Sequence, residues 1–456
     1  MRLRTLKRHS LLSPERSVVG AFLATVIIGA FLLALPISNT DGAWHLSSDS
    51  LFLSTSATCV TGLDPVGVGT ALTNFGLVVL VILAEIGGVG IMTIGTFFFI
   101  AMGKRLSVSE ERIVMNTLGE NSVGGISRII LSTLFFTLTW EILGTILLAW
   151  RLHVAHGYSP HHALAQGVFL SVMAFCNAGF TITADSLCLF ATDRILMITM
   201  LTLILVGGIG FIVHGNLIAL RPWRNKRRNR GRLTLHSYIV LTTTAIILAI
   251  GTVGYLVFEW AGALGAFSGI DKVIGALFQT VTSRTAGFAA IPTSSLRDVS
   301  VVLTTVIMFI GAAPGSTGGG IKITTAAILF ATIRDIVLNR QTTEIRNRSL
   351  PTRVVKDAIA ITVLSLVVIT GATFVIAVTE ESTGVPMFRL FFEVVSAFAT
   401  TGLSLDTTPT LTIGGRLCII VCMFIGRLGP ATLAMSMSQN TSGPAKRFPE
   451  ENVIVG

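Results

Sequence analysis

Long apolar runs alternate with shorter apolar runs along the chain, and polar or basic segments separate them. A helix that crosses a bilayer needs roughly 20 apolar residues, so each long run predicts one transmembrane helix. We place these eight helices near residues 17–38, 71–102, 128–150, 194–220, 237–260, 299–333, 358–379 and 414–438. The shorter runs cannot cross a bilayer and are expected to enter and leave on one side, as pore helices at residues 51–59, 162–176, 271–284 and 387–400.

Each short run ends in a tip of small residues that includes a glycine. The four tips are Val60, Thr61 and Gly62; Asn177, Ala178 and Gly179; Thr285, Ala286 and Gly287; and Thr400, Thr401 and Gly402. Their glycines lie 117, 108 and 115 residues apart. A near-constant period over the whole chain indicates four copies of one unit, each a helix, a re-entrant pore loop and a second helix.

Non-helical backbone at membrane depth is tolerated only where it is buried in protein or lines a water-filled cavity. Four tips around one axis would present a ring of backbone carbonyls, which can replace the hydration shell of a cation. Glycine suits such a tip because it adopts backbone angles closed to other residues and lets the main chain approach a ligand. The alternative is four unrelated loop glycines, which leaves their common period unexplained.

Composition and charge agree with a membrane protein built from helices. The 456 residues are 52% hydrophobic and 12% charged, against about 25% charged in soluble domains, which indicates an all-α integral membrane protein. Of the 33 Lys and Arg residues, 24 cluster beside the ends of apolar runs, as cytoplasmic segments do. These cytoplasmic segments account for the net charge of +10, so we expect no nucleic-acid partner. The dense basic segment 221–232 is open to RNA or anionic lipid, and we favour a loop that sets the topology.

These patterns divide the chain into repeats joined by cytoplasmic segments, with both termini inside the cell. The divisions are an N-terminus (1–16), repeat 1 (17–102), a linker (103–126), repeat 2 (127–220), a basic loop (221–236), repeat 3 (237–333), a second linker (334–357), repeat 4 (358–438) and a C-terminal tail (439–456).

The second helix of each repeat carries small residues at a similar distance from its tip. They are Gly87 and Gly88, Gly207 and Gly208, Gly311 and Ala312, and Gly426 beside Arg427. Small residues let helices pack closely in lipid. They would also let a pore-lining helix bend, and the two interpretations are compatible.

Repeat 3 departs most from a regular helix. Residues 311–320 contain five glycines and a proline, and an interior glycine costs a helix about 1 kcal/mol and a proline about 3 kcal/mol. Irregular backbone at that depth should line the permeation path. We interpret segment 311–322 as an intramembrane gate below the tips, formed by Gly311, Pro314, Gly315, Ser316, Thr317, Gly318, Gly319, Gly320 and Lys322. A phosphate-binding loop is disfavoured, because it would end in Gly-Lys-Ser/Thr and follow a strand.

Arg427 occupies the position of Gly88, Gly208 and Ala312 in repeat 4. A charge inside a span should face water or a partner rather than lipid. Below the tips, a fixed positive charge would weaken cation occupancy. The alternative is a salt bridge that ties helices together, with Glu85, Glu141 or Glu393 as its acid.

The sequence offers no catalytic set of side chains, so we expect no enzyme activity. The five cysteines include no CxxC pair, which disfavours a disulfide framework or a zinc site. Four histidines cluster in one external loop, at positions 153, 156, 161 and 162. A metal site there is conceivable, and a solvated loop is the interpretation we favour.

Taken together, the four tips, segment 311–322 and Arg427 resemble the Trk/Ktr/HKT superfamily of potassium transporters over nearly the whole chain. About 16 residues precede the first span and the ending 447–456 resembles a Ktr-type tail, so the likeness is closest to the Ktr-type membrane subunit. The resemblance implies potassium uptake across a bacterial plasma membrane, dependent on sodium in some members. It also implies a homodimer with one pore per subunit, bound to a cytosolic ring of nucleotide-binding regulatory subunits.

For individual residues, the resemblance implies that the twelve tip residues form a selectivity filter for K⁺, the only metal ion expected. It implies no covalently bound cofactor, with the nucleotide on the partner rather than on this chain. Relatives that move sodium often carry serine at the first filter glycine, so Gly62 favours potassium.

Two other functions stay open. The membrane subunit of an ATP-driven potassium pump shares a filter of this kind and would usually be longer. A secondary transporter with re-entrant hairpins would typically show two inverted halves, whereas this chain shows four copies in one orientation.

Overall fold

The computed structural model describes residues 14–45, 47–90, 126–183, 185–220 and 233–429. Several predicted segments lie wholly or partly outside the described residues: the N-terminus to residue 13, the end of the second helix (91–102), the linker 103–125, the basic loop at 221–232, and the C-terminal region from 430, which includes the end of the last span and the tail.

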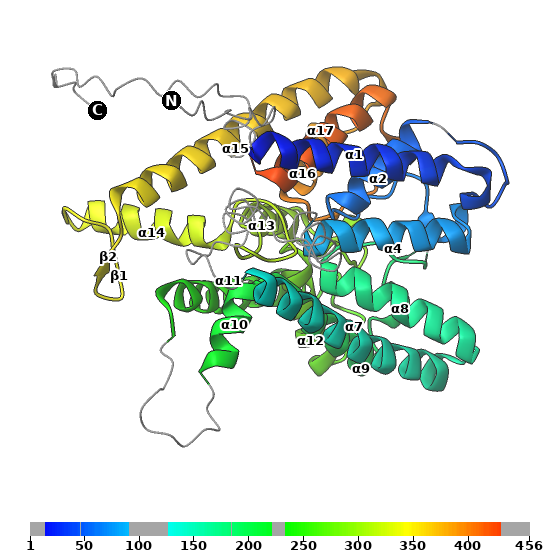
Figure 1. Ribbon diagram of the computed structural model, residues 1–456, viewed down its shortest axis with the longest axis horizontal. Helices are drawn as coiled ribbons and strands as arrows, with labels where there is room; N and C mark the ends of the chain where they lie inside the picture. The colour runs from blue at the N-terminus through cyan, green and yellow to red at the C-terminus, as the bar shows by residue number, and fades with distance from the viewer. Residues whose placement is uncertain (1–13, 46, 91–125, 184, 221–232, 430–456) are drawn as a thin grey trace, which may run out of the picture.

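The described chain is almost entirely helical, and each repeat contributes three helices in the predicted order (Figure 1). The first helices are α1 (Pro14–Ala34), α7 (Ile126–His156), α11 (Leu235–Glu259) and α15 (Thr352–Thr379). The short pore helices are α2 (Ser48–Thr58), α8 (Pro160–Cys176), α12 (Gly269–Thr282) and α16 (Met387–Ala399). The second helices are α4 (Asn74–Val89), α9 (Arg194–Ile209), α13 (Asp298–Phe309) and α17 (Ile413–Leu428).

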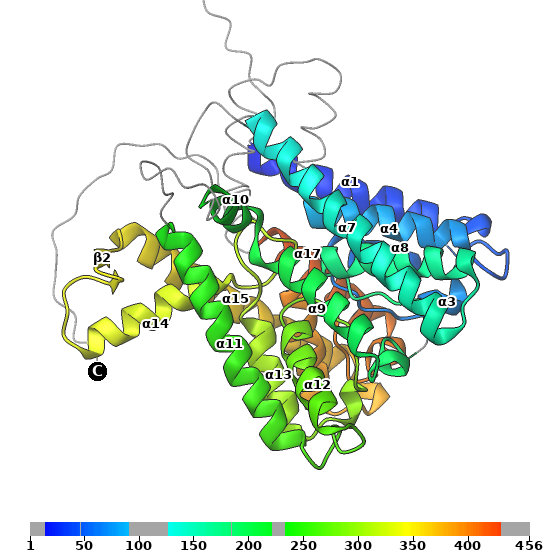
Figure 2. The same ribbon diagram turned by 90° about the horizontal axis from the view of Figure 1, so that it is seen from below.

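The remaining elements connect or extend the repeats. They are α3 (Val68–Ala71), α10 (Phe211–Ala219), α14 (Ile323–Val337), and the antiparallel strands β1 (Glu344–Ile345) and β2 (Arg348–Ser349), with short 3-10 turns elsewhere. The second linker, predicted at 334–357, is therefore shorter than expected, because α14 and α15 run into it from both sides. Figures 1 and 2 show α14 and the strands extending to one side of the molecule.

Side-chain caps define where three of the second helices begin. The side chains of Thr73, Asp193 and Thr412 accept hydrogen bonds from the first-turn backbone N–H groups of Gly76, Leu196 and Gly415. Such caps satisfy donors that the helix itself leaves unpaired. The same device occurs at the start of the second helix in repeats 1, 2 and 4.

Glycines end three of the second helices within the described residues. Gly90, Gly210 and Gly429 follow α4, α9 and α17 with φ of 95°, 94° and 84°, a conformation that glycine reaches without penalty and that ends a helix. The predicted span 194–220 is thereby divided into α9 and α10, which are bent by 95°. In repeat 3 the predicted span 299–333 is interrupted by the glycine-rich segment between α13 and α14.

Three helices of the described chain are long and apolar enough to cross a bilayer, and α9 with α10 adds a fourth if the bent pair is one span. The apolar segments Val18–Ala34, Asn74–Val89 and Asp298–Phe309 are shorter. The total of eight spans stays a prediction.

Packing closes the four repeats into a circle. Each first helix contacts the pore helix of its own repeat. Each second helix contacts the pore helix of the next repeat, in the pairs α4 with α8, α9 with α12, and α13 with α16. The circle is completed by α17, the last described helix, which packs against α2 near the start (Figure 1). The four pore helices therefore surround a common centre.

Candidate functional site

The four tips share one backbone conformation. The first residue of each is left-handed although none is glycine, with φ of 57° at Val60, 60° at Asn177, 70° at Thr285 and 51° at Thr400. Two residues later each tip glycine is again at positive φ, from 70° to 94°. A side chain in the left-handed region costs roughly 1–2 kcal/mol. The same strained pattern at four places indicates a common geometric requirement.

Backbone hydrogen bonds hold the tips by their amides. The N–H of the middle residue donates back to its own pore helix, from Thr61 to Ser56 O at 2.7 Å, from Ala178 to Met173 O at 2.8 Å, from Thr401 to Ser396 O at 2.8 Å, and from Ala286 to Thr282 O at 3.0 Å. In the first tip, Ser56 Oγ also donates to Leu63 O at 2.8 Å. These hydrogen bonds fix the backbone of each tip against its own pore helix.

The middle carbonyls meet the glycines of the neighbouring tips. A Cβ added to Gly62 would fall within 3.0 Å of Ala178 O, and the same holds from Gly179 to Ala286 O, from Gly287 to Thr401 O, and from Gly402 to Thr61 O. Each tip therefore contacts the next tip along the chain, and the fourth tip contacts the first. The structure thus brings all twelve predicted tip residues to one place, as a closed ring in which a larger residue at any of the glycines would strike a carbonyl.

A cavity of about 330 Å³ opens on one side of the ring. Its lining includes the four tip glycines together with Asp64, Ser404 and Asp406. Asp64 accepts hydrogen bonds from the backbone N–H groups of Val66, Gly67 and Val68. Carboxylates at the mouth of a cavity raise the local cation concentration. The sequence prediction missed both aspartates, although they follow the first and fourth tip glycines by two and four residues.

The repeated small residues of the second helices are explained by the ends of the pore helices. A Cβ on Gly87, Gly207 or Gly426 would overlap the carbonyl oxygen of Thr58, Phe175 or Phe398, each two residues before the first tip residue. These glycines therefore allow the second helices to support the tips from behind.

The predicted gate segment lies directly against the tips. A Cβ on Gly318 would overlap Thr285 Oγ1, and one on Gly319 would overlap Thr400 Oγ1, so the loop touches tips 3 and 4. Thr317 donates from its hydroxyl to Phe175 O at 3.3 Å, at the base of tip 2. Lys322 closes the loop on itself by donating from Nζ to Gly318 O at 2.6 Å. The segment contacts the first residues of tips 3 and 4, whereas the Asp64 cavity is lined by the four tip glycines.

Arg427 connects this loop to the first repeat. Its guanidinium donates from Nη1 to Thr317 O and from Nη2 to Gly87 O. Within the described chain it forms no ion pair with an acid, and Glu393 instead accepts from Ser404 and Thr408. The salt bridge considered as an alternative is therefore replaced by hydrogen bonds to two carbonyls.

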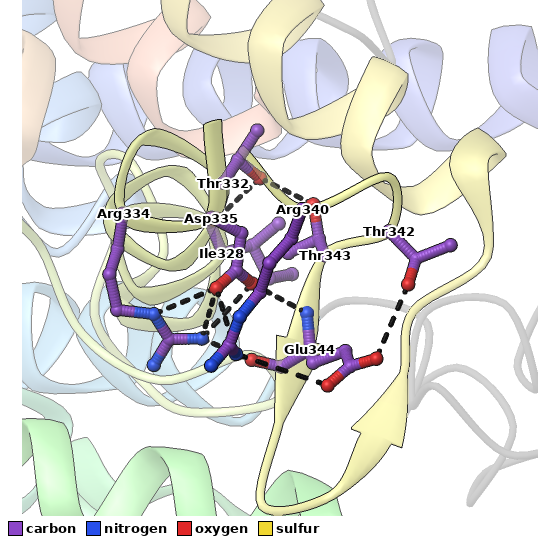
Figure 3. Close-up of polar contacts among 8 residues, drawn as sticks. All are labelled: Ile328, Thr332, Arg334, Asp335, Arg340, Thr342, Thr343 and Glu344. Carbon is purple, nitrogen blue, oxygen red and sulfur yellow. Dashed lines mark hydrogen bonds and ion pairs between the residues drawn. The ribbon is translucent and has the colours of Figure 1, made fainter. Parts of the chain in front are cut away.

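Beyond the loop, α14 leads to a polar cluster that sequence reasoning missed (Figure 3). Near the end of α14 the buried carboxylate of Asp335 accepts from Arg334 Nε at 2.9 Å and from the backbone N–H of Glu344, in β1, at 2.7 Å. Arg340 donates to the same carboxylate at 3.4 Å. Asp335 thus fixes the strand hairpin to the helix that begins at the gate.

The four clustered histidines, at positions 153, 156, 161 and 162, form no metal-binding group within the part of the chain that the structure describes. His156 and Arg151 both contact the carboxylate of Asp193, at 2.9 and 2.7 Å, and His162 stacks on Tyr158. Burial acts to raise the pKa of Asp193, but hydrogen bonds from Arg151 and His156 outweigh it and hold that pKa below its ordinary value. All five cysteines are free.

Comparison with known proteins gives a consistent result. A family described as TrkH, cation transport protein, matches residues 19–443. The chain is 35% identical to Ktr system potassium uptake protein B of Bacillus subtilis, over 97% of this chain and 96% of the relative. It is 31% identical to the potassium/sodium uptake protein NtpJ of Enterococcus hirae, over 100% of this chain and 99% of the relative. Its fold is similar to the crystal structure of the potassium transporter TrkH from Vibrio parahaemolyticus, with a TM-score of 0.72 and 21% identity over 94% of this chain and 86% of that one.

Proposed function

The chain belongs to the TrkH family of cation transport proteins, and on that premise we propose that it is the potassium-translocating membrane subunit of a bacterial uptake system. The relatives that match over nearly their full length are Ktr system potassium uptake proteins and a potassium/sodium uptake protein. They give no support to a subunit of an ATP-driven pump. The proposed location is the plasma membrane, crossed several times, with both termini in the cytoplasm.

The closed ring of tips is the observation that carries this proposal. Potassium loses its water on entering the ring, and the carbonyls of Thr61, Ala178, Ala286 and Thr401 take the place of that water. Asp64 and Asp406 concentrate cations at the outer mouth. Each tip is short, so we expect fewer stacked sites and weaker discrimination against sodium than in channels with a longer filter.

Segment 311–322 acts as the gate in this proposal. It lies against tips 3 and 4, and Arg427 holds it to Gly87 of the first repeat. While these hydrogen bonds persist, the loop obstructs the path below the ring. Release of Thr317 from Arg427 lets the loop move aside. The guanidinium then stays near the path as a fixed positive charge, which keeps potassium from binding too tightly to leave.

Control of the gate is assigned to α14. This helix begins at Ile323, directly after Lys322, and ends at the Asp335 cluster. A displacement of the hairpin would therefore be transmitted along a rigid helix to the loop. We assign this input to a cytosolic ring of nucleotide-binding regulatory subunits, with the chain itself acting as a homodimer that has one pore per subunit and binds no nucleotide.

The test is potassium uptake in bacteria that lack their own uptake systems, with and without a cosupplied regulatory subunit, followed by flux into liposomes that contain the purified chain. We expect growth at low potassium and a flux that accepts K⁺ and Rb⁺ in preference to Na⁺. A purified, folded chain that passes none of these ions even with the regulatory subunit contradicts the proposal.

A further inference from the structure

Three potential metal ligands meet inside the molecule, beside the second tip. They are Glu85 on α4, Glu141 on α7 and Cys176 at the end of α8. One carboxylate oxygen from each glutamate and the sulfur of the cysteine all lie within 4.8 Å of one another. The thiol of Cys176 donates to Glu85 Oε2 at 3.1 Å. Three helices from two repeats contribute, so local sequence does not account for the cluster.

Glu141 is the member whose presence most needs an explanation. Its residue is 6% exposed, and its Oε1 atom has no hydrogen-bond partner. In the parts of the chain that the structure describes, neither Glu85 nor Glu141 forms an ion pair with a basic side chain. Two adjacent carboxylates at membrane depth repel each other and lose their hydration. The pair therefore needs positive charge between its oxygens, which either a shared proton or a bound cation supplies.

We propose that Glu85, Glu141 and Cys176 bind a divalent cation of the borderline-soft class, such as Zn²⁺ or Cd²⁺. A thiolate with two carboxylates is a donor set that suits this class and that K⁺ or Mg²⁺ does not prefer. Tetrahedral Zn²⁺ takes sulfur at about 2.3 Å and oxygen at about 2.0–2.2 Å, so its ligands lie roughly 3.5 Å apart. Since the ligand atoms lie within 4.8 Å of one another, the cluster reaches that spacing by contracting by at most about 1.3 Å.

Binding would proceed with loss of the Cys176 proton to solvent, since the thiolate is the ligand. Three protein ligands leave a fourth position for water. Glu85 is only partly buried and provides the approach to the cluster, whereas Glu141 and Cys176 are buried.

The cluster is placed to affect ion passage, a consequence that rests on the proposed function. Cys176 directly precedes Asn177, the first residue of tip 2. A Cβ on Gly88 would lie 2.7 Å from Cys176 Sγ, so α4 already touches the thiol. Contraction around a cation pulls the base of tip 2 toward α4 and α7 and distorts the ring, which inhibits potassium flux.

The test is a titration of the purified full-length chain with Cd²⁺. Binding is monitored through the ultraviolet charge-transfer band that forms between a thiolate and cadmium. Cys176→Ser should abolish the part of the band that belongs to this site. Glu141→Gln and Glu85→Gln should each weaken Cd²⁺ binding at least about tenfold. Even changes to residues that only support the direct ligands of a metal weaken binding by about 10- to 100-fold. Zn²⁺ should compete with Cd²⁺.

Cys59→Ser is the matched control. Cys59 is buried, free and directly precedes tip 1, as Cys176 precedes tip 2, but it is not part of the glutamate cluster. It should leave the band of the Glu85 cluster intact. An unchanged band in Cys176→Ser overturns the site. Unchanged Cd²⁺ affinity in both glutamate variants also overturns it, and means that the two carboxyl groups only share a proton.

Flux measurements separate this inference from the proposed function. The unloaded protein should pass potassium, and Cd²⁺ should inhibit the wild type and Cys59→Ser but not Cys176→Ser. Binding without inhibition overturns the effect on tip 2, and a lack of flux before any Cd²⁺ is added counts against the proposed function instead.

Discussion

Replacement of Gly402 by alanine tests the ring of tips where it is tightest. A Cβ on Gly402 would lie 2.0 Å from Thr61 O, in the neighbouring tip, whereas real Cβ atoms essentially never approach within 3.0 Å. The two tips must therefore separate by about 1 Å. Gly402 also has φ of 89°, so alanine adds a backbone penalty of roughly 1–2 kcal/mol.

The separation has a calculable effect on potassium. A carbonyl oxygen that carries about half an elementary charge and withdraws from about 3 Å to about 4 Å from a monovalent cation loses about 0.7 kcal/mol at an effective dielectric constant of about 20. Since 1.4 kcal/mol is a factor of ten, this corresponds to about threefold in affinity for each displaced carbonyl. We expect the potassium concentration for half-maximal flux into liposomes to rise at least about threefold in Gly402→Ala.

Gly384→Ala provides the control within the same repeat. Gly384 has φ of 72°, and a Cβ there would meet nothing within 4 Å. Both variants carry the backbone penalty, and Gly402→Ala adds the overlap with Thr61 O, so it should lose more thermal stability; only Gly402→Ala should change potassium affinity and the preference for K⁺ over Na⁺. If both fold and their flux curves coincide, the carbonyl ring does not bind the transported ion.

Four other changes test the remaining parts of the pathway in the same liposome assay. Gly62→Ser should reduce the preference for potassium over sodium, because a side chain there meets the carbonyl of the second tip; the ratio of K⁺ to Na⁺ flux measures it. Deletion of residues 316–319 should raise basal flux and reduce dependence on the regulatory subunit, because the obstruction is shortened. Arg427→Ala should raise maximal flux or apparent potassium affinity, and Arg427→Gln, which keeps one donor, should do so less; thermal stability in detergent is the control. Asp335→Asn should weaken the response to the regulatory subunit several-fold, because the hairpin loses its charged anchor, whereas Asp357→Asn, at an exposed site on α15, should not.

Particular outcomes would contradict each assignment. Wild-type selectivity in a folded Gly62→Ser variant removes that position from the ion site. Unchanged or lower flux after the loop deletion contradicts the gate. A joint loss of stability and activity in Arg427→Ala would mean that this arginine serves packing between helices. Equal regulation in Asp335→Asn and Asp357→Asn would mean that the hairpin does not carry the signal.

The repeated pattern made the tips predictable from sequence. Short apolar runs, glycines at a common period and small residues in the second helices are local features, and each has a local structural cause. The closeness of Gly87 to Thr58 O, for example, requires the small residue that the sequence displayed. The five glycines and the proline of residues 311–320 likewise revealed the loop in repeat 3, because no regular helix tolerates that composition.

What the sequence could not supply depends on contacts between distant segments. Gly207 and Gly208 suggested that the second helix of repeat 2 could bend, but the size of the bend, 95° at Gly210, depends on contacts with other segments that the sequence does not display. The pairing of Arg427 with Thr317 and Gly87 was missed because backbone carbonyls leave no mark in sequence. The Asp335 cluster combines a helix end with a hairpin, and its charges looked like an ordinary basic linker.

The most direct test of the central claim is to locate the transported ion. Crystals of the protein grown or soaked in rubidium, which substitutes for potassium, would give an anomalous-difference map. We expect a peak on the axis enclosed by the carbonyls of Thr61, Ala178, Ala286 and Thr401, and a smaller peak there in Gly402→Ala. A fully occupied rubidium site elsewhere, with none at this ring, would contradict it.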